Sequence, residues 1–211
     1  MLPMLNLKKN YRIGLIIVFF LVIPVSVWAG VPTEKIKQTT EKLIAVLKDP
    51  HLQGPAKMQE RNKKLREVAD ERFDWEEMAK RTLGKYWNER TPEEKKTFVP
   101  LFITLMERSY LDKVQGYSGE KVNYTGESID GKYGVIDVKI LTNQGQEIAV
   151  SYKIKSRDDD WFIYDIVAEG VSLVNNYRVQ FNSILIQSPY AVLVKKLEEK
   201  VAQPQSPKPS N

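Results

Sequence analysis

The sequence contains no cysteine and a single histidine, His51, among its 211 residues. A chain without cysteine has no disulfide bond, no thiol nucleophile and no cysteine-bound metal. His51 follows Asp49-Pro50 beside a predicted helix end, a placement typical of a surface loop. Nucleophilic triads usually need a histidine base, and no cluster of His, Asp and Glu has the spacing of metal ligands. The sequence therefore argues against these catalytic and metal sites, and its scattered glycines form no phosphate-binding loop.

Net charge is also low. The chain has 32 Lys and Arg against 27 Asp and Glu, which gives a formal net charge of +5. Residues 1–29 hold three of the cations (Lys8, Lys9 and Arg12) and no acid, so removing them from +5 leaves +2 for the rest of the chain. Nucleic-acid binding needs a concentrated basic patch. We therefore expect no nucleic-acid partner.

Both ends of the chain differ from its middle. Residues 1–29 combine a basic start, an uncharged run from Ile13 to Ile23 and a small-residue site, which predicts a signal peptide cut after Ala29. The apolar run makes a helix of only about 16 Å, against a hydrocarbon core of about 30 Å, so it is too short for an anchor. Residues 203–211 are rich in Pro, Gln, Ser and Lys and predict a disordered tail. One domain, residues 30–202, remains.

Helical patterns fill the first half of this domain. Two four-residue segments, Asp74–Glu77 and Thr91–Glu94, have the sequence of capping boxes, in which the first and last side chains each accept from the other residue's amide. Gly84 is placed to end the helix that the first box opens, and Pro100 should kink the helix that the second box opens. Apolar residues at helical spacing predict helices over residues 33–48, 55–73 and 91–114.

From Gly119 the hydrophobic period changes from 3.6 to two. Turn-forming residues at short intervals separate the runs, which predicts an antiparallel meander. After Gly170 the helical period returns, and Ser188-Pro189 separates two further helices. Helices, strands and helices in this order predict an α+β domain with helices laid on the sheet. The predicted strands are residues 121–127, 132–142, 146–155 and 161–168.

Two groups of acidic residues are candidates for chemistry. Asp158, Asp159 and Asp160 follow one another at a predicted hairpin tip, where solvent exposure is a better explanation than a calcium loop, because the alternating ligands are missing. Asp165 lies inside an apolar strand. A buried carboxylate there is either a general base or a structural acceptor for a backbone amide or a cation such as Arg178. We favour the structural role.

The strands and the last helices hold more aromatic and branched apolar residues than one meander needs. These side chains either form the core or line a cavity for an apolar ligand. Core and cavity lining look alike in a sequence, so both interpretations stay open at this stage.

Three blocks of the sequence together carry a family resemblance: Phe73–Ala79 with Leu83–Trp87, Thr91–Glu94 continuing to Tyr110, and Trp161–Leu173 with Asn176–Phe181. In these blocks the chain resembles the MlaC family of periplasmic phospholipid-binding proteins, and the resemblance runs from about Thr33 to Val201. Pro100, inside the long helix, and Ser188-Pro189, in place of a glycine-bearing connection, depart from the family pattern.

This resemblance implies an NTF2-like antiparallel sheet of about four strands, covered by N- and C-terminal helices, with an apolar cavity between them. It implies a periplasmic monomer that carries one phospholipid as cargo, without a cofactor or an enzymatic activity, and so maintains outer-membrane lipid asymmetry. The implied partners are an inner-membrane ABC transporter with its MCE-type substrate-binding subunit and an outer-membrane lipoprotein and porin complex. The resemblance indicates the region of the lipid site but no individual residues.

Periodicity within that region predicts which side chains line the lipid site. Three alternatives remain: an NTF2-like enzyme with Asp165 as acid or base, an interaction module with a filled core, and a carrier of another lipid such as a hopanoid. The predicted lining residues are Phe102, Leu105, Val138, Ile140, Val150, Tyr152, Tyr164, Val167, Val171, Leu173, Val174, Tyr177 and Phe181.

Overall fold

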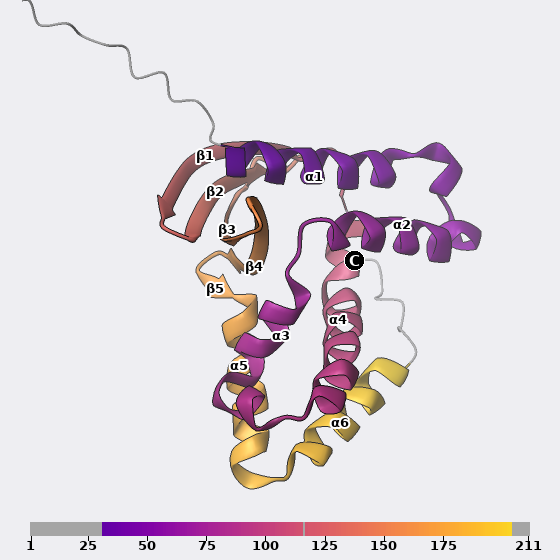
Figure 1. Cartoon of the computed structure of the whole chain (residues 1–211). Helices are drawn as coiled ribbons and strands as arrows, with labels where there is room; N and C mark the ends of the chain where they lie inside the picture. The colour runs from indigo at the N-terminus through magenta and orange to yellow at the C-terminus, as the bar shows by residue number, and fades with distance from the viewer. Residues whose placement is uncertain (1–30, 116, 204–211) are drawn as a thin grey trace, which may run out of the picture.

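The computed structural model describes residues 31–115 and 117–203 (Figure 1). The predicted signal peptide lies outside the described residues, as do residues 204–211 of the predicted tail. The helices are α1 (Val31–Lys48), α2 (Met58–Asp70), α3 (Trp75–Leu83), α4 (Pro92–Gln115), α5 (Leu173–Gln187) and α6 (Tyr190–Ala202). The strands are β1 (Lys121–Asp130), β2 (Tyr133–Leu141), β3 (Glu147–Arg157), β4 (Asp160–Ala168) and β5 (Val171–Ser172). The predicted α+β class is confirmed.

The helix ends follow the local sequence, with one exception. At Thr91–Glu94 both halves of the capping box form: the Thr91 amide donates to the Glu94 carboxylate at 2.9 Å, and the Glu94 amide donates to the Thr91 hydroxyl at 3.2 Å. At Asp74–Glu77 only one half forms, because the Asp74 amide donates instead to the Ile163 carbonyl at 2.8 Å. The reciprocal contact predicted for Glu77 was therefore wrong, and that carboxylate is available to other partners.

The strands form one antiparallel sheet in the order β1-β2-β3-β4-β5, so the predicted meander is confirmed. The pairing register places apolar side chains in rows that cross one face of the sheet. Val122, Ile140 and Ile148 form one row, and Val138 pairs with Val150 in the next. Two residues in the left-handed region, Asp158 and Asp159, make the tight turn before β4. β5 has only two residues and was not predicted, because so short a strand has no period to read.

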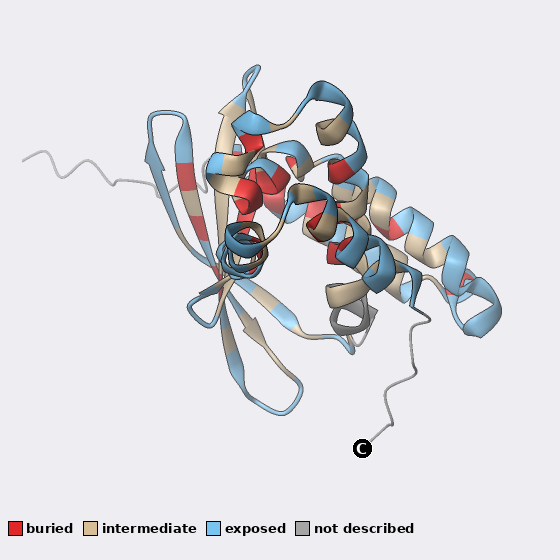
Figure 2. Ribbon diagram, turned by 90° about the horizontal axis from the view of Figure 1, so that it is seen from below, coloured by how far each residue is buried: buried red, intermediate tan, exposed pale blue. Residues whose placement is uncertain are grey.

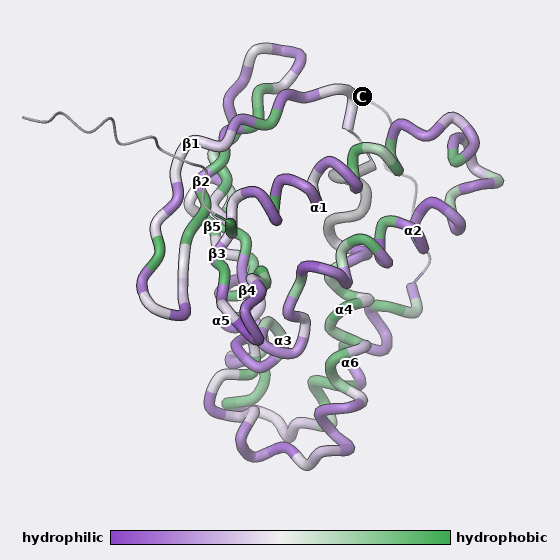
Figure 3. Tube along the Cα trace, turned by 45° about the horizontal axis from the view of Figure 1, so that its top comes forward, coloured by the Kyte–Doolittle hydropathy of each residue, from purple (hydrophilic) through white to green (hydrophobic). Residues whose placement is uncertain are grey.

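Two separate cores hold the molecule together (Figure 2). The first lies between α1 and the sheet, where Ile36 packs on the apolar rows of β2, β3 and β4. The hydropathy colouring shows hydrophobic segments alternating with hydrophilic ones along the strands (Figure 3). The second core lies among α3 to α6 and includes the fully buried Met78, Phe98 and Leu193. Helices and sheet therefore bury two apolar layers instead of enclosing a single one.

None of the described helices is long and apolar enough to cross a membrane. Pro100 lies inside α4, as predicted, and the Thr104 hydroxyl donates to its carbonyl at 3.0 Å.

Candidate functional site

Besides Trp161 and Ala168 in β4, six apolar side chains on the sheet are only half buried, although they lie on the face that α1 covers. We call this group the apolar face, and it borders the core beneath α1. Complete burial would be favourable by roughly 25 cal/mol for each Å² removed from water, so a half-covered apolar surface is suited to an apolar ligand. The apolar face consists of Val122, Tyr124, Ile140, Ile148, Tyr152 and Ile166.

Two tyrosine hydroxyls introduce polar groups into this apolar surface. Burial raises the pKa of Tyr152 to about 12, so its hydroxyl stays protonated at neutral pH. The hydroxyl of Tyr124 is buried, which raises its pKa, and Thr40 lies near enough to oppose this effect, but the hydroxyl forms no hydrogen bond of good geometry with a described residue. A buried hydroxyl without a partner costs about 1–3 kcal/mol. The apolar face therefore offers one unsatisfied donor to a ligand that carries an oxygen acceptor.

The predicted lining residues do not form one group. Four of them (Val138, Ile140, Val150 and Tyr152) lie on the apolar side of the sheet, either in the core under α1 or beside it. Seven belong to the helical core or pack against it: Phe102, Leu105, Tyr164, Leu173, Val174, Tyr177 and Phe181. Periodicity identifies which residues share a face, but it does not show which face meets which helix.

Two predicted lining residues belong to neither core. Val171, in β5, has 58% of its surface exposed. Val167 pairs with Ser151, whose hydroxyl donates to Asp137 on the side of the sheet that faces away from α1. Val167 therefore faces away from α1, whereas Val171 pairs with Ala168 and lies on the α1 side of the sheet, at its exposed edge.

A cleft lies on the other side of β4, between α3 and α5, and it is not the apolar cavity between sheet and helices that the resemblance implied. Its volume is about 620 Å³, and its walls are mainly charged. Five cations and two carboxylates line it, which leaves an excess of three positive charges. A smaller groove of about 240 Å³ adjoins it and shares Gly84, Lys85, Asn175 and Arg178. The residues lining the cleft are Glu77, Lys80, Arg81, Gly84, Lys85, Lys153, Tyr164, Asp165, Ser172, Val174, Asn175 and Arg178.

Glu77 organises the inner wall of this cleft. Its carboxylate pairs with Arg81 at 2.8 Å and with Lys155 at 3.3 Å. Burial alone raises the pKa of Glu77, but the charges of Arg81 and Lys155 outweigh this effect, so the pKa lies below its usual value. The guanidinium of Arg81 also stacks over the Tyr164 ring, 4.0 Å from its centroid. These groups form a fixed inner layer.

Asp165 is buried at the edge of the same cleft. It accepts from the Ser172 hydroxyl at 2.7 Å and from the Val174 amide at 3.1 Å, and Lys153 lies 3.4 Å away. The expected backbone partner is confirmed, but the cation is Lys153 and Arg178 makes no such pair. With both oxygens engaged, Asp165 ties β4 to the start of α5. Asp165 also lines the cleft, so its position alone does not exclude a role as an acid or base.

The hairpin tip differs in part from its prediction. Asp158 and Asp159 are exposed, as expected of a solvated turn. Asp160 instead pairs with Lys35 and Arg72, each at 2.9 Å, and connects the sheet to α1 and to the turn that follows α2. No group of His, Asp or Glu within the described residues could hold a metal ion.

Sequence reasoning missed Val122, Tyr124, Ile148 and Ile166 as members of the apolar face. Alternation in β3 places Ile148 on the same side as Val150 and Tyr152, so that signal was present. No lining residue was predicted in β1, and the irregular register of β4 puts Ile166 and Tyr164 on opposite sides. Sequence reasoning also missed the cations Lys80, Lys85 and Lys153, because no local pattern distinguishes them from solvated surface charges.

Comparison with known proteins decides the family. Residues 37–199 match the family described as MlaC protein. The chain belongs to the MlaC family. A curated MlaC-family relative from Haemophilus influenzae, the intermembrane phospholipid transport system binding protein MlaC, is 23% identical over 129 residues. That match covers 59% of this chain, and the chain spans about 60% of the length of the relative.

One solved structure has the same fold as this MlaC-family chain. It is a phospholipid-binding protein from Ralstonia solanacearum, determined in complex with a phospholipid. The TM-score is 0.74 at 23% sequence identity, and the match covers 81% of this chain and 97% of the other. At this identity the likeness shows the fold.

Proposed function

We propose that this MlaC-family protein binds a phospholipid with its acyl chains against the apolar face and carries it between the outer and inner membranes. One observation supports the location of the site: six apolar side chains share one side of the sheet and remain half buried beside α1. The family match and the relatives named above support phospholipid as the ligand.

The physical requirement for such a carrier is large. Each acyl methylene exposed to water costs about 0.8 kcal/mol, so roughly 30 methylenes represent about 24 kcal/mol. A free phospholipid therefore leaves a membrane extremely slowly. A protein surface of branched apolar side chains replaces one apolar environment with another, so loading and release can be nearly balanced.

The polar end of the lipid needs few contacts, because a carrier has to release its cargo. The Tyr124 hydroxyl is buried beside the apolar face without a partner, and it can donate to an ester oxygen at the junction of acyl chain and head group. The proposal places the head group near solvent. A polycyclic lipid such as a hopanoid is the second candidate ligand, since the apolar face itself selects no head group.

We further propose where this transport takes place. The protein acts in the periplasm, as a monomer, with an inner-membrane ABC transporter and its MCE-type subunit at one end of the transport route. An outer-membrane lipoprotein and porin complex lies at the other end, and the net effect is to maintain outer-membrane lipid asymmetry. No bond is made or broken. The oxygens of Asp165 are engaged by Ser172, Val174 and Lys153, which supports a structural role over an acid or base.

Solvent extraction of the purified protein, followed by mass spectrometry, tests the proposal directly. Wild type should yield phospholipid close to one molecule per chain. Ile148→Glu, which places a carboxylate on the apolar face, should lose most of it. Ile186→Glu is the matched control, because Ile186 is 67% exposed on α5, far from the sheet core, and should keep its lipid.

Two results would overturn the proposal: wild type without lipid, or Ile148→Glu with the lipid content of wild type. A polycyclic lipid in the extract would replace phospholipid as the cargo and leave the site in place. Circular dichroism of each variant shows whether a loss of lipid reflects unfolding. A carboxylate at Val171, which shares the α1 side of the sheet with Ala168, is expected to lower lipid content as well.

A further inference from the structure

The charged cleft between α3, β4 and α5 is separate from the apolar face. The apolar side chains lie on the side of the sheet that packs against Ile36 of α1. Lys153 and Asp165, which line the cleft, are paired in register on the other side, together with Ser151 and Val167. A lipid on the apolar face therefore leaves the cleft open, and the cleft needs its own explanation.

The charges of the cleft form two layers. The inner layer is internally paired: Glu77 contacts Arg81 and Lys155, while Asp165 contacts Lys153. These contacts stabilise the fold, and they leave little of the inner charge for a ligand.

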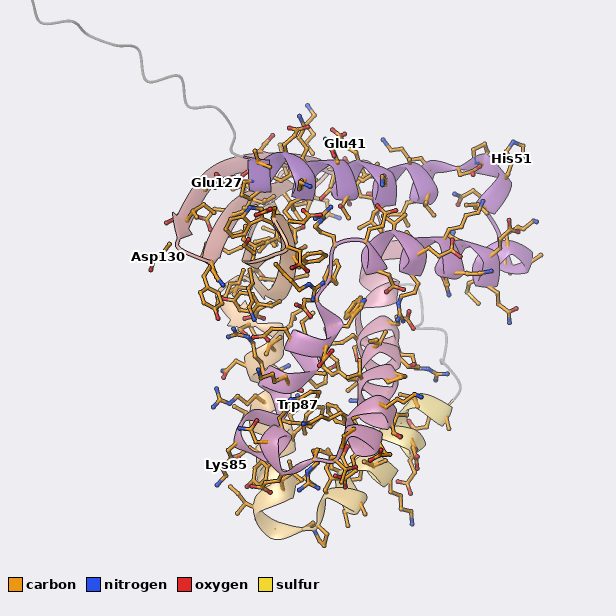
Figure 4. The ribbon with its side chains drawn as sticks, viewed as in Figure 1. Glu41, His51, Lys85, Trp87, Glu127 and Asp130 are labelled. Atoms are coloured by element: carbon orange, nitrogen blue, oxygen red, sulfur yellow. The ribbon has the colours of Figure 1, made fainter. Side chains whose placement is uncertain are left out.

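The outer layer consists of three exposed cations, Lys80, Lys85 and Arg178. None of them forms an ion pair with a described residue. Lys85 extends outward from the turn that follows α3 (Figure 4) and lies over the Tyr86 ring, 5.1 Å from its centroid. Because Glu77 and Asp165 offset Arg81 and Lys153 among the lining residues, the excess positive charge of the cleft lining is concentrated at its rim, where a ligand would enter.

Arg178 packs closely against the backbone of Gly84 at the rim of the cleft. Gly84 ends α3 with a φ of 56°, and a Cβ added there would lie 3.3 Å from Nε of Arg178. The guanidinium therefore packs against a backbone that carries no side chain. Arg178 lies between the cleft and the smaller groove, because its side chain lines both.

Apolar groups border these cations. The smaller groove is lined by Leu83 and by Val179, and Val179 is 61% exposed. A soluble phosphate ion would make no use of such neighbours. A ligand that carries both acidic and apolar side chains would use the cations and the apolar groups together.

We propose that the cleft is a docking site for an acidic segment of a partner protein, with an apolar side chain of that segment in the groove beside Arg178. The concave shape favours a protein segment over a membrane, because a protruding loop or helix end fills a cleft of about 620 Å³ and a flat bilayer surface does not. Carboxylates of the segment pair with Lys80, Lys85 and Arg178. The inference rests on the proposed function only in that a carrier has to dock.

A display library of short random peptides, selected on the purified full-length protein, tests this proposal. The selected peptides should be rich in Asp and Glu and contain at least one large apolar residue. Their binding should weaken about tenfold or more in the double variant Lys85→Glu/Arg178→Glu, because two attractive charges become repulsive. Lys80→Glu, a single change on an exposed helix surface, should also weaken peptide binding, but by less. This variant tests the proposal even if the double variant fails to fold.

The matched control is Lys63→Glu/Lys195→Glu, which changes the net charge by the same amount at two side chains that are 78% and 77% exposed and lie outside the cleft. Peptide binding should be unchanged in this control. Selected peptides without acidic enrichment, or equal weakening in both double variants, would overturn the proposal. So would binding to phosphatidylglycerol vesicles that depends on Lys85 and Arg178 while peptide binding does not.

Lipid content measured on the same variants separates this inference from the proposed function. Lys85→Glu/Arg178→Glu should retain its lipid while losing the peptides, and Ile148→Glu should lose its lipid while keeping the peptides. If the peptide result fails, the lipid result still supports the proposed function, and if the lipid result fails, the peptide result still supports the docking site.

Discussion

The carboxylate of Asp165 accepts a hydrogen bond from the amide of Val174 at 3.1 Å, and this contact joins β4 to the first turn of α5. Ser172, the N-cap of α5, donates its hydroxyl to the same carboxylate and accepts from the Asn175 amide. Two amides at the start of α5 are thus satisfied, one directly by a strand residue and the other through Ser172. The position of α5 relative to the sheet depends on this buried acid.

Removal of this acid should destabilise the fold. Asp165→Ala leaves the Val174 amide and Lys153 without their partner, which should cost about 2–4 kcal/mol of unfolding free energy. Asp165→Asn keeps an acceptor for the amide and loses only the charge, so the loss should be smaller. Urea denaturation of the three proteins measures both values. Equal stability of wild type and Asp165→Ala would contradict this structural role.

Gly84 should tolerate a side chain less well than Gly170 does. Both have positive φ angles, 56° and 80°, and the ψ of −125° at Gly84 lies outside the left-handed helical region, in a conformation that only glycine adopts readily. A Cβ at Gly170 meets no atom within 4 Å, whereas one at Gly84 meets Arg178. We expect Gly170→Ala to lose stability from backbone strain alone. Gly84→Ala should lose more, because its backbone conformation is less accessible to alanine and because Arg178 also has to move. Thermal denaturation compares the two variants, and a greater loss at Gly170 would contradict this expectation.

The buried hydroxyl of Tyr152 should make stability fall at high pH. Its pKa is about 12 in the folded state, against about 10 in an unfolded chain. Below pH 10 both states are protonated and stability is unaffected. Above pH 10 only the unfolded state loses its proton, so stability declines progressively toward pH 12.

Comparison with Tyr152→Phe measures this effect. The variant cannot ionise at this position, so it should lose less unfolding free energy than wild type between pH 8 and pH 11. Tyr190, whose pKa burial also raises to about 12, remains in both proteins and contributes equally. Identical pH dependence in the two proteins would show that Tyr152 ionises as freely as in the unfolded chain.

If a phospholipid occupies the apolar face, its removal should lower the melting temperature. A ligand that binds only the folded state adds about 2.7 kcal/mol of stability when it is present at about 100 times its Kd. Delipidated wild type should therefore melt at a lower temperature than the protein as purified, and added phospholipid should restore it. Ile148→Glu should show no difference between the two preparations. An equal melting temperature of wild type before and after delipidation would count against lipid at this face.

Much of the fold was predictable because its signals are local. Thr91 and Glu94 form a complete capping box from four neighbouring residues, and Gly84 ends α3 as its conformational freedom suggests. The alternation in β2 and β3 placed Val138 and Val150 on one side of the sheet, and the structure pairs them. Such features depend only on residues a few positions apart.

The partners of charged groups could not be predicted in the same way. Glu77 and Asp74 read as a reciprocal pair, but Ile163 of β4 takes the amide that Glu77 was expected to bind. Asp160 looked like a solvated turn residue, and it pairs with Lys35 and Arg72. Each of these contacts joins segments far apart in the chain, so no local pattern records it.

The sequence by itself determined the elements, their order, the antiparallel meander and the membership of the MlaC family, because capping, hydrophobic period and turn chemistry act between near neighbours. Only the tertiary structure decided which apolar residues meet. It divided the predicted lining between a helical core that includes Phe102 and a sheet core that includes Val150. It also brought Lys85 and Arg178 to one cleft. The physical reason is that a strand has two equivalent sides, and only the packing of α1 on one and of α3 and α5 on the other gives each its environment.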